Sequence, residues 1–337
     1  MSKKITVENR RYIGSKAKLR DWIISTIKKE CGAHNSFADI FAGTGSVSVG
    51  AMEDFNELII NDILYSNNVC YEAFWGKGKY SNTKISNFIE KYNNLNPNDI
   101  KLNYFSKNFG GKYFSKDVAK IIGYIREDIE INRKKLTKKE YLILLASLIY
   151  STDKVANTVG HYDAYIKKEP IKKTFQVDTI TPFDFKNVSI YKEDANTLVR
   201  KIEADVVYVD PPYNSRQYSR FYHLLENLTK WETPELFGTA LKPDTENTSD
   251  YCKVKAPEVF ANLIKDLKCK YIVVSYNNTY NPKSNSSKNK ITLEEIEDTL
   301  NSKGKTKVFK KDHKYFNAGN TNFDNHQEFL FITKVYG

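Results

Sequence analysis

An acid, two prolines and an aromatic residue stand together at Asp210-Pro211-Pro212-Tyr213, directly after an apolar run. Consecutive prolines donate no amide hydrogen and hold the chain extended. The Asp210 carboxylate and the Pro211 carbonyl are therefore left as fixed acceptors beside the Tyr213 ring. Such a group suits a planar substrate with an exocyclic NH2, because the two acceptors take its two hydrogens while the ring stacks on its plane. The alternative is a turn that ends a strand and buries a tyrosine.

A glycine-rich turn is the second arrangement that could bind a ligand. Gly43 and Gly45 follow an apolar run, where glycine lets the backbone turn sharply and approach a ligand closely. Asp39 and Phe41 precede the turn, and Asp62 follows the next apolar run. In a doubly wound sheet, an acid at that place commonly accepts hydrogen bonds from a ribose diol. The pattern favours a nucleoside cofactor over an ordinary tight turn with a surface aspartate.

The elements that must position these motifs are strands alternating with helices. Short apolar runs bounded by turn residues predict buried parallel strands, and helical patterns lie between them. The alternation indicates an α/β sheet with right-handed crossovers, which binds ligands at the carboxyl ends of its strands. The expected strands are 36–41, 57–60, 188–191, 205–209, 271–275 and 328–333. The expected helices are 17–29, 46–53, 257–267 and 293–302, and the polar stretch 277–290 is expected to be a mobile loop.

The alternation stops from about residue 71 to residue 185, where the pattern becomes helical and basic. Helices are expected at 118–132 and 138–151. We interpret this region as a second domain inserted between the second and third strands. The expected division is an inserted domain at 75–184 and a catalytic domain made of 1–74 and 185–337.

The charge is concentrated in the same region. The chain has 52 Lys+Arg and 41 Asp+Glu residues, a formal net charge of +11. Residues 107–173 hold 15 basic and 8 acidic side chains, and 15 − 8 gives +7 for this stretch. Basic residues interleaved with Tyr and Phe indicate a polyanionic partner. A solvated lysine-rich surface is an equally good interpretation of the charge alone.

The composition also excludes several classes of protein. With 337 residues and 40% hydrophobic side chains, the chain can bury a sizeable core and is not expected to be disordered. No run approaches the ~20 apolar residues that a membrane-spanning helix needs, and the N-terminal segment lacks the apolar stretch of a secretory signal. Four cysteines lie far apart with no CxxC pair, which argues against a zinc site and a disulfide framework. A cytoplasmic protein without a metal or a membrane partner is expected.

Three blocks of sequence, in this order, resemble the α-class adenine-N6 DNA methyltransferases of restriction–modification systems and their Dam-like relatives. Residues 11–16 (RYIGSK) resemble the N-terminal cofactor motif of the family, residues 39–45 (DIFAGTG) resemble its FxGxG motif, and residues 210–213 (DPPY) resemble its catalytic motif. A target-recognition insertion separates the last two. The resemblance implies a Rossmann-like methyltransferase sheet with a mainly helical inserted recognition domain. It also implies S-adenosylmethionine as the methyl donor.

The resemblance assigns roles to the positions that match. Tyr12 and Lys16 would line the methionine end of the cofactor, and Asp62 would hold its ribose hydroxyls. Asp194 falls where family members bind the adenine amino group of the cofactor, but Ala195 stands where many relatives have Phe. The implied cofactor-binding residues are Tyr12, Gly14, Lys16, Asp39, Phe41, Gly43, Gly45, Asp62, Asp194 and Asp210. The implied catalytic residues are Asp210, Pro211, Pro212 and Tyr213.

The implied substrate is an adenine in double-stranded DNA. Its amino group cannot be attacked within the base stack, so the base would be flipped out. Polar, basic and aromatic residues after the catalytic motif and within the insertion are candidates for DNA contact; for those after the motif, a helix start with a satisfied histidine is the equal alternative. The candidates are Arg216, Gln217, Tyr218, His223, Lys154, Asn157, His161 and Tyr162. A separate cognate restriction endonuclease is the protein partner that such a system implies.

Two other interpretations compete with a DNA methyltransferase. An rRNA methyltransferase of the guanine-N2 type carries Asp-Pro-Pro-Tyr or a close variant, but the motif at Tyr12–Lys16 and the large insertion favour DNA. A catalytically inactive DNA-binding relative is the second alternative, and the intact Asp210 and Tyr213 argue against it. The region 308–335 resembles the terminal hairpin of the family, and we expect its apolar residues to be simple core.

Overall fold

The computed structural model describes residues 5–168, 174–183, 185–280, 288–312 and 326–337. The chain forms two compact units, and the helical unit comprises Met1–Ile13, Leu64–Phe185 and Ser219–Glu246. The sheet unit comprises Gly14–Ile63, Lys186–Tyr218 and Asn247–Gly337. The helical unit is thus larger than the insertion expected at 75–184, because it also takes in an N-terminal segment and the helix that follows the catalytic motif.

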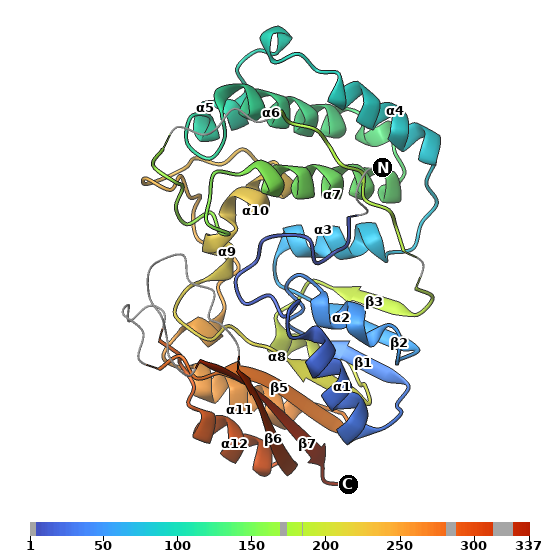
Figure 1. Cartoon of the computed structure of the whole chain (residues 1–337), viewed down its shortest axis with the longest axis vertical. Coiled ribbons are helices and arrows are strands. Elements are labelled where there is room, and N and C mark those ends of the chain that lie inside the picture. The colour runs from blue at the N-terminus through green and yellow to red at the C-terminus, as the bar shows by residue number, and fades with distance from the viewer. Residues whose placement is uncertain (1–4, 169–173, 184, 281–287, 313–325) are drawn as a thin grey trace. The chain divides into compact units, whose positions relative to one another are not determined.

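The sheet unit is built on one seven-stranded sheet with the strand order β3-β2-β1-β4-β5-β7-β6 (Figure 1). The pairs among β1 to β5 are parallel, and β7 runs antiparallel to both β5 and β6. The strands are β1 (Ser36–Asp39), β2 (Glu57–Asn61), β3 (Val188–Tyr191), β4 (Val206–Val209), β5 (Tyr271–Asn277), β6 (Gly304–Asp312) and β7 (Gln327–Val335). The six strands expected from the sequence are present, and the Rossmann-like α/β fold is confirmed.

The strand register brings three acids to one edge of the sheet. Asp39 is the last residue of β1, and it lies opposite Ile60 in β2 and Tyr208 in β4. Asp62 and Asp210 come directly after β2 and β4. Since parallel strands place their carboxyl ends at the same edge, the acids of the glycine turn, the second strand and the catalytic motif meet there.

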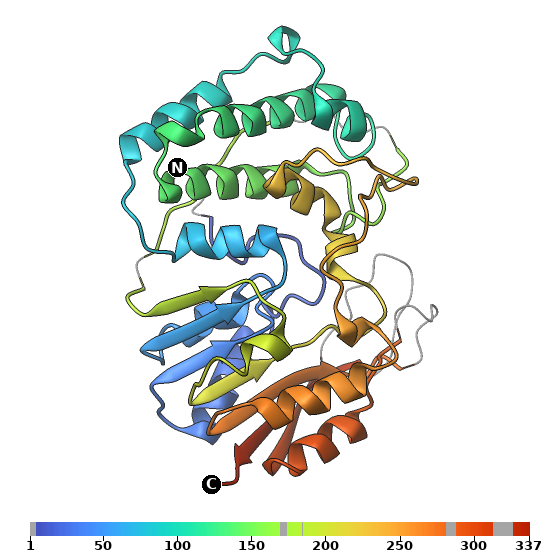
Figure 2. The same cartoon turned by 180° about the vertical axis from the view of Figure 1, so that it is seen from behind.

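Helices cover both faces of this sheet. Views from opposite sides show α1 and α2 on one face and α8, α11 and α12 on the other (Figures 1 and 2). The helices are α1 (Arg20–Cys31), α2 (Ser46–Ala51), α8 (Ala195–Leu198), α11 (Ala256–Asp266) and α12 (Leu293–Asn301). Helix α12 begins with a capping box in which Thr292 and Glu295 satisfy each other's backbone amides.

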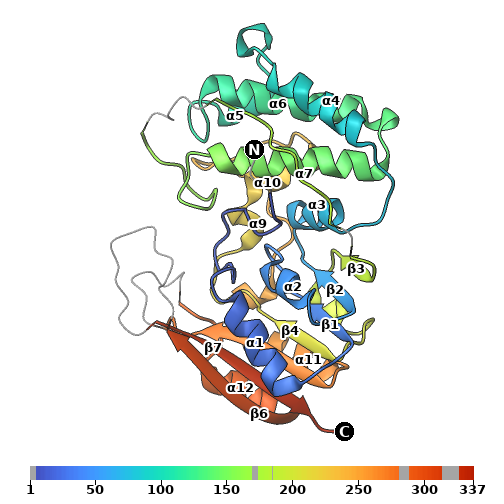
Figure 3. The same ribbon diagram turned by 45° about the vertical axis from the view of Figure 1, so that its right-hand side comes forward.

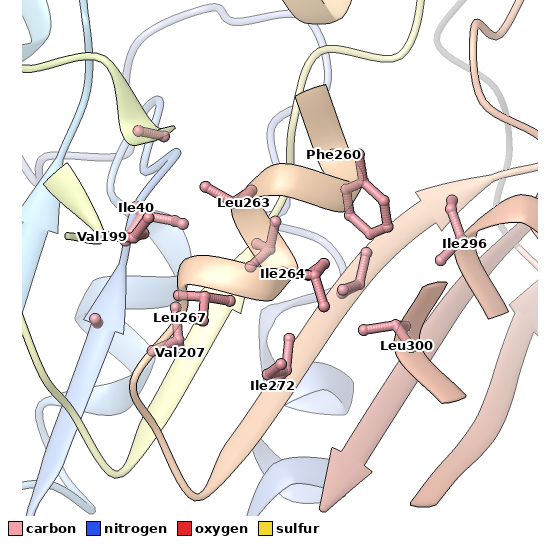
Figure 4. Close-up of a cluster of buried hydrophobic side chains, with 14 of the residues drawn as sticks. Ile40, Val199, Val207, Phe260, Leu263, Ile264, Leu267, Ile272, Ile296 and Leu300 are labelled. Carbon is pink, nitrogen blue, oxygen red and sulfur yellow. The ribbon is translucent and has the colours of Figure 1, made fainter. Parts of the chain in front are cut away.

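The core beneath α11 and α12 holds the sheet rigid behind the site. Figure 4 shows Phe260, Leu263 and Ile264 of α11 beside Val207 of β4 and Ile272 of β5. All five side chains are buried. Burying side chains of this size contributes about 1.5–3 kcal/mol each relative to leaving them exposed. The end of β4, and with it the catalytic motif, is therefore anchored by a packed apolar layer.

The helical unit is a set of helices packed around α7 (Figure 3). Helix α7 is buried along most of its length and begins with a capping box between Thr137 and Glu140. The helices of this unit are α3 (Tyr65–Phe74), α4 (Asn82–Asn93), α5 (Tyr104–Phe109), α6 (Lys116–Ile131), α7 (Lys138–Val155) and α10 (His223–Lys230), and α9 (Tyr218–Phe221) leads into it. The helices expected at 118–132 and 138–151 correspond to α6 and α7. Within the described ranges, no helix has the length and apolar character needed to cross a membrane.

Two buried charged side chains join helices of this unit. Arg126 of α6 donates to the carbonyls of Leu228 and Thr229 at the end of α10, at 2.8 and 3.1 Å. Glu226 of α10 accepts from the amides of Tyr65 and Ser66 at the start of α3, at 3.0 and 2.8 Å. Helix ends leave backbone groups without intrahelical partners. These two side chains supply the missing partners.

Two expectations concern the last third of the chain. The C-terminal hairpin is present as β6 and β7, and Phe331 and Ile332 are buried while Phe329 is partly buried against the core. The polar loop expected at 277–290 falls partly outside the described residues, since 281–287 are not described.

Candidate active site

The catalytic motif begins where the fully buried strand β4 ends. Asp210 Oδ2 lies 2.9 Å from the ammonium of Lys16. Lys16 Nζ also donates to the Tyr213 hydroxyl at 2.6 Å and to the carbonyl of Gly14 at 3.3 Å. The Tyr213 hydroxyl in turn donates to Asp210 Oδ1. Lys16 therefore joins two residues of the motif that follows β4, nearly two hundred positions later in the sequence.

Burial and charge together set the ionisation of this group. Burial raises the pKa of Asp210 to about 6, against the lowering effect of Lys16. Burial disfavours the charged form of Lys16, but the carboxylates of Asp210 and Glu328 outweigh that effect and raise its pKa. At neutral pH the motif therefore holds an ion pair in which Asp210 is an anion.

Glu328 of β7 is a member of this group that sequence reasoning did not single out. Its Oε1 lies 3.4 Å from Lys16 Nζ and 3.2 Å from the Tyr213 hydroxyl oxygen. Ser275 of β5 donates to the same oxygen at 2.7 Å. The sequence does contain a signal, because an acid stands beside the apolar run of a strand that was expected to be buried. An acid in such a place needs a partner.

The Tyr213 ring is held by its neighbours rather than free on both sides. Its edge meets the Tyr276 ring with centroids 4.6 Å apart, and its carbonyl accepts from the Lys290 amide at 2.8 Å. Pro211 is buried and Pro212 is partly buried, directly after β4. These contacts fix the motif in one orientation. Stacking of Tyr213 on a substrate ring stays a prediction.

The glycine turn at the end of β1 has the backbone that its sequence predicts. Gly43 and Gly45 have φ values of 54° and 74°, a region that residues with a side chain rarely adopt. The Gly43 amide donates to Asp62 Oδ2 at 3.0 Å. The turn of the first strand and the acid of the second are therefore brought together. Whether Asp62 also holds a ribose stays a prediction.

Asp39 is the least satisfied acid at this edge. It is buried, and its Oδ2 accepts from Ser48 Oγ at 2.7 Å. Its Oδ1 is buried and has no hydrogen-bond partner within the part of the chain that the structure describes. Burial raises the pKa of Asp39 to about 7, and the nearby Asp210 and Asp62 carboxylates add to the rise. A buried acceptor without a partner is unusual and suits a ligand that carries a cation or a donor.

Phe41 and Asp194 lie on the side of the sheet where α8 begins. Asp194 is the N-cap residue of α8 and accepts from the Thr197 amide at 3.1 Å. The Phe41 ring meets the edge of Tyr251, with centroids 5.2 Å apart. The Tyr251 hydroxyl donates to Asn196 at 2.9 Å, and its ring belongs to the same core as Ala195. Tyr251 thus contributes an aromatic ring to the core that contains Ala195.

The rest of the N-terminal motif divides between the two units. Gly14 has a φ of +77°, a region that residues with a side chain rarely adopt, and a Cβ there would make a tight contact of 3.1 Å with the Tyr218 hydroxyl. Tyr12 belongs to the helical unit, where its ring stacks on Tyr222 with centroids 4.6 Å apart and planes 5° apart. Its expected contact with the cofactor stays a prediction.

Two of the expected DNA contacts are buried, which makes them the weakest of the eight candidates. Tyr162 is 0% exposed, and its hydroxyl donates to Asp153 at 2.8 Å. His223 is 1% exposed; its ring nitrogens lie 3.0 Å from the Arg220 carbonyl and 2.9 Å from the Ala240 carbonyl. Burial lowers the pKa of His223 to about 4, so the ring is neutral. Both side chains are used inside the helical unit and offer no surface to a duplex.

Three of the remaining candidates are engaged with protein. Gln217 exchanges two hydrogen bonds with the backbone of Ser249, at 2.9 and 2.7 Å. Asn157 donates to the carbonyls of Lys112 and Ile166 at 3.1 and 3.0 Å. The His161 ring stacks on Phe221, with centroids 5.0 Å apart. These residues shape loops and stay weaker candidates for DNA contact.

Arg216, Tyr218 and Lys154 are the other three candidates. Arg216 and Tyr218 are partly exposed. Lys154 is 70% exposed at its side chain and lies 2.9 Å from Asp178. An exposed ion pair contributes little to stability. Lys154 can therefore exchange its partner for a phosphate at low cost.

The match to a known family follows the same residues. The family model of the D12 class N6 adenine-specific DNA methyltransferases matches residues 12–287. This range covers most of the chain and includes the lysine, the glycine turn and the Asp-Pro-Pro-Tyr motif. The chain therefore belongs to the D12 class N6 adenine-specific DNA methyltransferase family.

Individual relatives agree with the family. The chain is 33% identical over 339 residues to the type II methyltransferase M.CviAII of Paramecium bursaria Chlorella virus 1, covering 96% of this chain and 98% of that one. It is 31% identical over 330 residues to M.NlaIII of Neisseria lactamica, covering 94% and 95%. It is 37% identical over 286 residues to the modification methylase StsI of Streptococcus sanguinis, covering 80% of this chain but only 44% of that protein. The chain thus spans less than half of the StsI methylase and nearly all of the other two.

Solved structures resemble the chain only loosely. A precorrin-6y C5,15-methyltransferase from Geobacter metallireducens gives a TM-score of 0.31 at 10% identity, and covers 96% of this chain and 93% of that one. The putative methylase HI0767 from Haemophilus influenzae gives a TM-score of 0.29 at 8% identity, and covers 95% of this chain and 96% of that one. Likeness at this level adds nothing to the description of the sheet given above.

Proposed function

We propose that this chain transfers a methyl group from S-adenosylmethionine to N6 of an adenine at a specific site in double-stranded DNA. The observation that carries the proposal is the hydrogen-bonded Lys16–Asp210–Tyr213 group at the end of β4. Its acceptors are fixed, and it lies at the sheet edge where ligands bind. Relatives named as modification methylases support a role as the modification enzyme of a restriction–modification system.

The residues at the sheet edge fit S-adenosylmethionine. The unpartnered Oδ1 of Asp39 suits the cationic amino group of such a molecule. Gly43 and Gly45 leave room for a ligand beside the backbone, Asp62 is the candidate for the ribose hydroxyls, and Asp194 for the adenine amino group. When bound, the cofactor supplies an electrophilic methyl group on a sulfonium. The chain's own residues then have to present the nucleophile.

Asp210 and the Pro211 carbonyl activate the target amino group. The lone pair of an adenine N6 is delocalised into the ring, so the nitrogen is a poor nucleophile. Hydrogen bonds from N6 to the two acceptors favour a tetrahedral nitrogen with a localised lone pair. Positioning and preorganised acceptors of this kind supply a large part of enzymatic acceleration. With its pKa at about 6, Asp210 is ionised at neutral pH and ready to accept.

DNA binding is proposed for the basic helical unit, with Lys154 as its most accessible candidate. The proposed substrate places the enzyme in the cytoplasm, and the restriction–modification role implies a separate cognate endonuclease. Methylome sequencing of a host that expresses the chain would give the modified base and its sequence context together. We expect N6-methyladenine at one recurring sequence.

A nucleoside assay tests the reaction itself. The chain is incubated with labelled S-adenosylmethionine and either duplex DNA or rRNA, and the product is digested to nucleosides. We expect label in N6-methyladenine from DNA. Label in N2-methylguanine from rRNA would support the rRNA enzyme instead. No label from either substrate would support the inactive DNA-binding relative.

A further inference from the structure

We propose that Glu328 is a positioning residue of the methyl-transfer site: its buried carboxylate shares Lys16 with Asp210 and thereby leaves Asp210 negative toward the substrate. This inference deepens the proposed function and depends on it. Among the described residues, Glu328 meets the catalytic group at Lys16 and at Tyr213 of the motif, and it has no assigned role toward the substrate. It acts through those residues.

Glu328 is buried, and its carboxylate contacts side chains from three parts of the sheet unit. Its exposed fraction is 3%, and its Oε1 accepts from Ser275 at 2.7 Å and lies 3.2 Å from the Tyr213 hydroxyl oxygen. The same oxygen lies 3.4 Å from Lys16 Nζ. Three groups from β5, the catalytic motif and the N-terminal segment therefore converge on one carboxylate oxygen.

The topology of the sheet delivers this carboxylate to the catalytic edge. Strand β7 runs antiparallel to β5, and Glu328 pairs with Asn277, the last residue of β5. The start of β7 is thus placed at the edge where the parallel strands end. Because β7 is antiparallel to β5, Glu328 near the start of β7 lies close to the residues that follow β4.

The charges explain why a second carboxylate is useful. With Lys16 as the only neighbour, the Asp210 carboxylate would be half of a neutral ion pair, and its power to attract the amino hydrogens would be reduced. Glu328 shares the Lys16 ammonium with Asp210, so the positive charge of the ammonium is only partly used by Asp210. Lys16 with Asp210 and Glu328 carries one net negative charge, which suits an amino nitrogen that becomes positive as it is methylated.

The lysine is equally necessary to the arrangement. Two carboxylates that face each other in a buried site cannot both ionise without a cation, since each raises the pKa of the other. Glu328 acts in the direction that raises the pKa of Asp210, and Lys16 acts in the direction that lowers it. The ionisation of Asp210 is therefore set by the balance between a cation from the N-terminal segment and an anion from β7.

Other titratable groups also face Asp210. Tyr213 hydrogen bonds to it, and Asp39 of β1 and Tyr208 of β4 interact with it electrostatically. Burial raises the pKa of both tyrosines well above the ordinary value, so both are neutral at working pH. Asp39 is present in the wild type and in every variant proposed below. Its effect on the pH dependence of the rate is therefore the same in all of them.

The test compares Glu328→Gln with the wild type on a duplex substrate over a range of pH. The variant keeps the shape of the side chain and loses its charge. We expect kcat to fall about tenfold with KM for DNA little changed, because Lys16 now neutralises Asp210. We also expect the acidic limb of the rate profile to move to lower pH by about half a unit or more, because the repulsion that raises the pKa of Asp210 is gone.

A double variant separates positioning from a merely structural role. Lys16→Met alone leaves two carboxylates facing each other and moves the acidic limb to higher pH. Lys16→Met/Glu328→Gln removes both charges, and its acidic limb returns toward that of the wild type. A structural role for Glu328 predicts no such return. This variant also keeps the proposal testable where Glu328→Gln alone fails to fold, since it retains the net charge of the group.

Two control variants and one measurement made without DNA or cofactor accompany this test. Ser275→Ala removes a hydrogen bond to Glu328 but no charge, and Glu30→Gln removes a carboxylate that pairs with Lys307 elsewhere in the sheet unit, so neither should move the acidic limb. Titration of Asp210 by carboxyl NMR, without DNA or cofactor, should show a lower pKa in Glu328→Gln. An unchanged pKa would overturn the inference, whereas a wild type that methylates nothing would overturn the proposed function instead.

Discussion

Buried charged groups are used differently in the two units of this chain. In the helical unit, Arg126 donates through all three of its nitrogens, to Leu228, Thr229, Tyr141 and Glu130. At the sheet edge, one ammonium is shared by two carboxylates and a phenol, and Asp39 keeps an acceptor without a partner.

This difference distinguishes buried charges that stabilise the fold from buried charges that are available to a ligand. A buried charge whose bonds are all made inside the protein has nothing left for a ligand, so it stabilises the fold. A buried group with a surplus of charge or an unfilled acceptor costs folding free energy, and that cost makes sense where a ligand completes the site.

Asp210→Ala should give the largest effect. The substitution removes the charged acceptor of the sheet edge, and we expect kcat to fall by at least about 10²- to 10³-fold. DNA binding, measured by gel shift, should persist because the helical unit is untouched. Methylation at a rate near that of the wild type would reject the assignment of the catalytic motif.

Asp39→Asn should change how stability depends on pH. The folded Asp39 keeps its proton up to a pKa of about 7, whereas the carboxyl of the unfolded chain, with its ordinary pKa of 3.8, loses its proton at lower pH. Between these values the folded state binds more protons, so the contribution of Asp39 to stability falls as pH rises and its full cost applies above pH 7. The variant lacks this cost, and it should gain about 2–4 kcal/mol over the wild type at pH 8.

Urea denaturation of the cofactor-free protein at pH 5 and pH 8 measures this gain. The advantage of Asp39→Asn should be larger at pH 8 than at pH 5. An equal advantage at both values would mean that Asp39 is ionised throughout. Binding of S-adenosylmethionine should weaken in the same variant, since the acceptor proposed for the amino group has lost its charge.

Tyr162→Phe and Lys154→Ala test the contrast within the helical unit, where the effects are smallest. Tyr162→Phe removes a buried hydrogen bond to Asp153 and should cost about 1 kcal/mol of stability with DNA affinity unchanged. Lys154→Ala should leave stability within about 0.5 kcal/mol and reduce the dependence of DNA affinity on salt by about one phosphate contact. A loss of DNA affinity in Tyr162→Phe at equal stability would restore that residue to the interface.

Contiguous signals account for what the sequence could predict. The strands at 36–41 and 205–209 are short apolar runs, and Asp210 lies within a motif that directly follows such a run. A strand end and the residues next to it stay together in any fold. For this reason the order of strands and helices, the glycine turn and the catalytic motif were all predictable.

Two kinds of information were not predictable in this way. Polarity alone does not tell a tyrosine that contacts DNA from one that is buried on an aspartate, so Tyr162 and His223 were assigned to DNA although the helical unit encloses them. Glu328 reaches the site through the register of an antiparallel strand. No local pattern gives that register. The sequence signal for Glu328 is that an acid stands beside the apolar residues of a strand expected to be buried.

The position of β7 has a consequence for how the protein is made. It follows β5 and β6 in sequence but lies between them in the sheet, so both of its pairings, and the contacts of Glu328 with Lys16 and Tyr213, wait until this last strand has been made. Contacts between residues so distant in sequence form late, because the loop they close is long. On the role proposed for Glu328, a growing chain holds its lysine and catalytic aspartate long before their third partner arrives. Methylation of DNA would then begin only after β7 has been synthesised and has paired with β5.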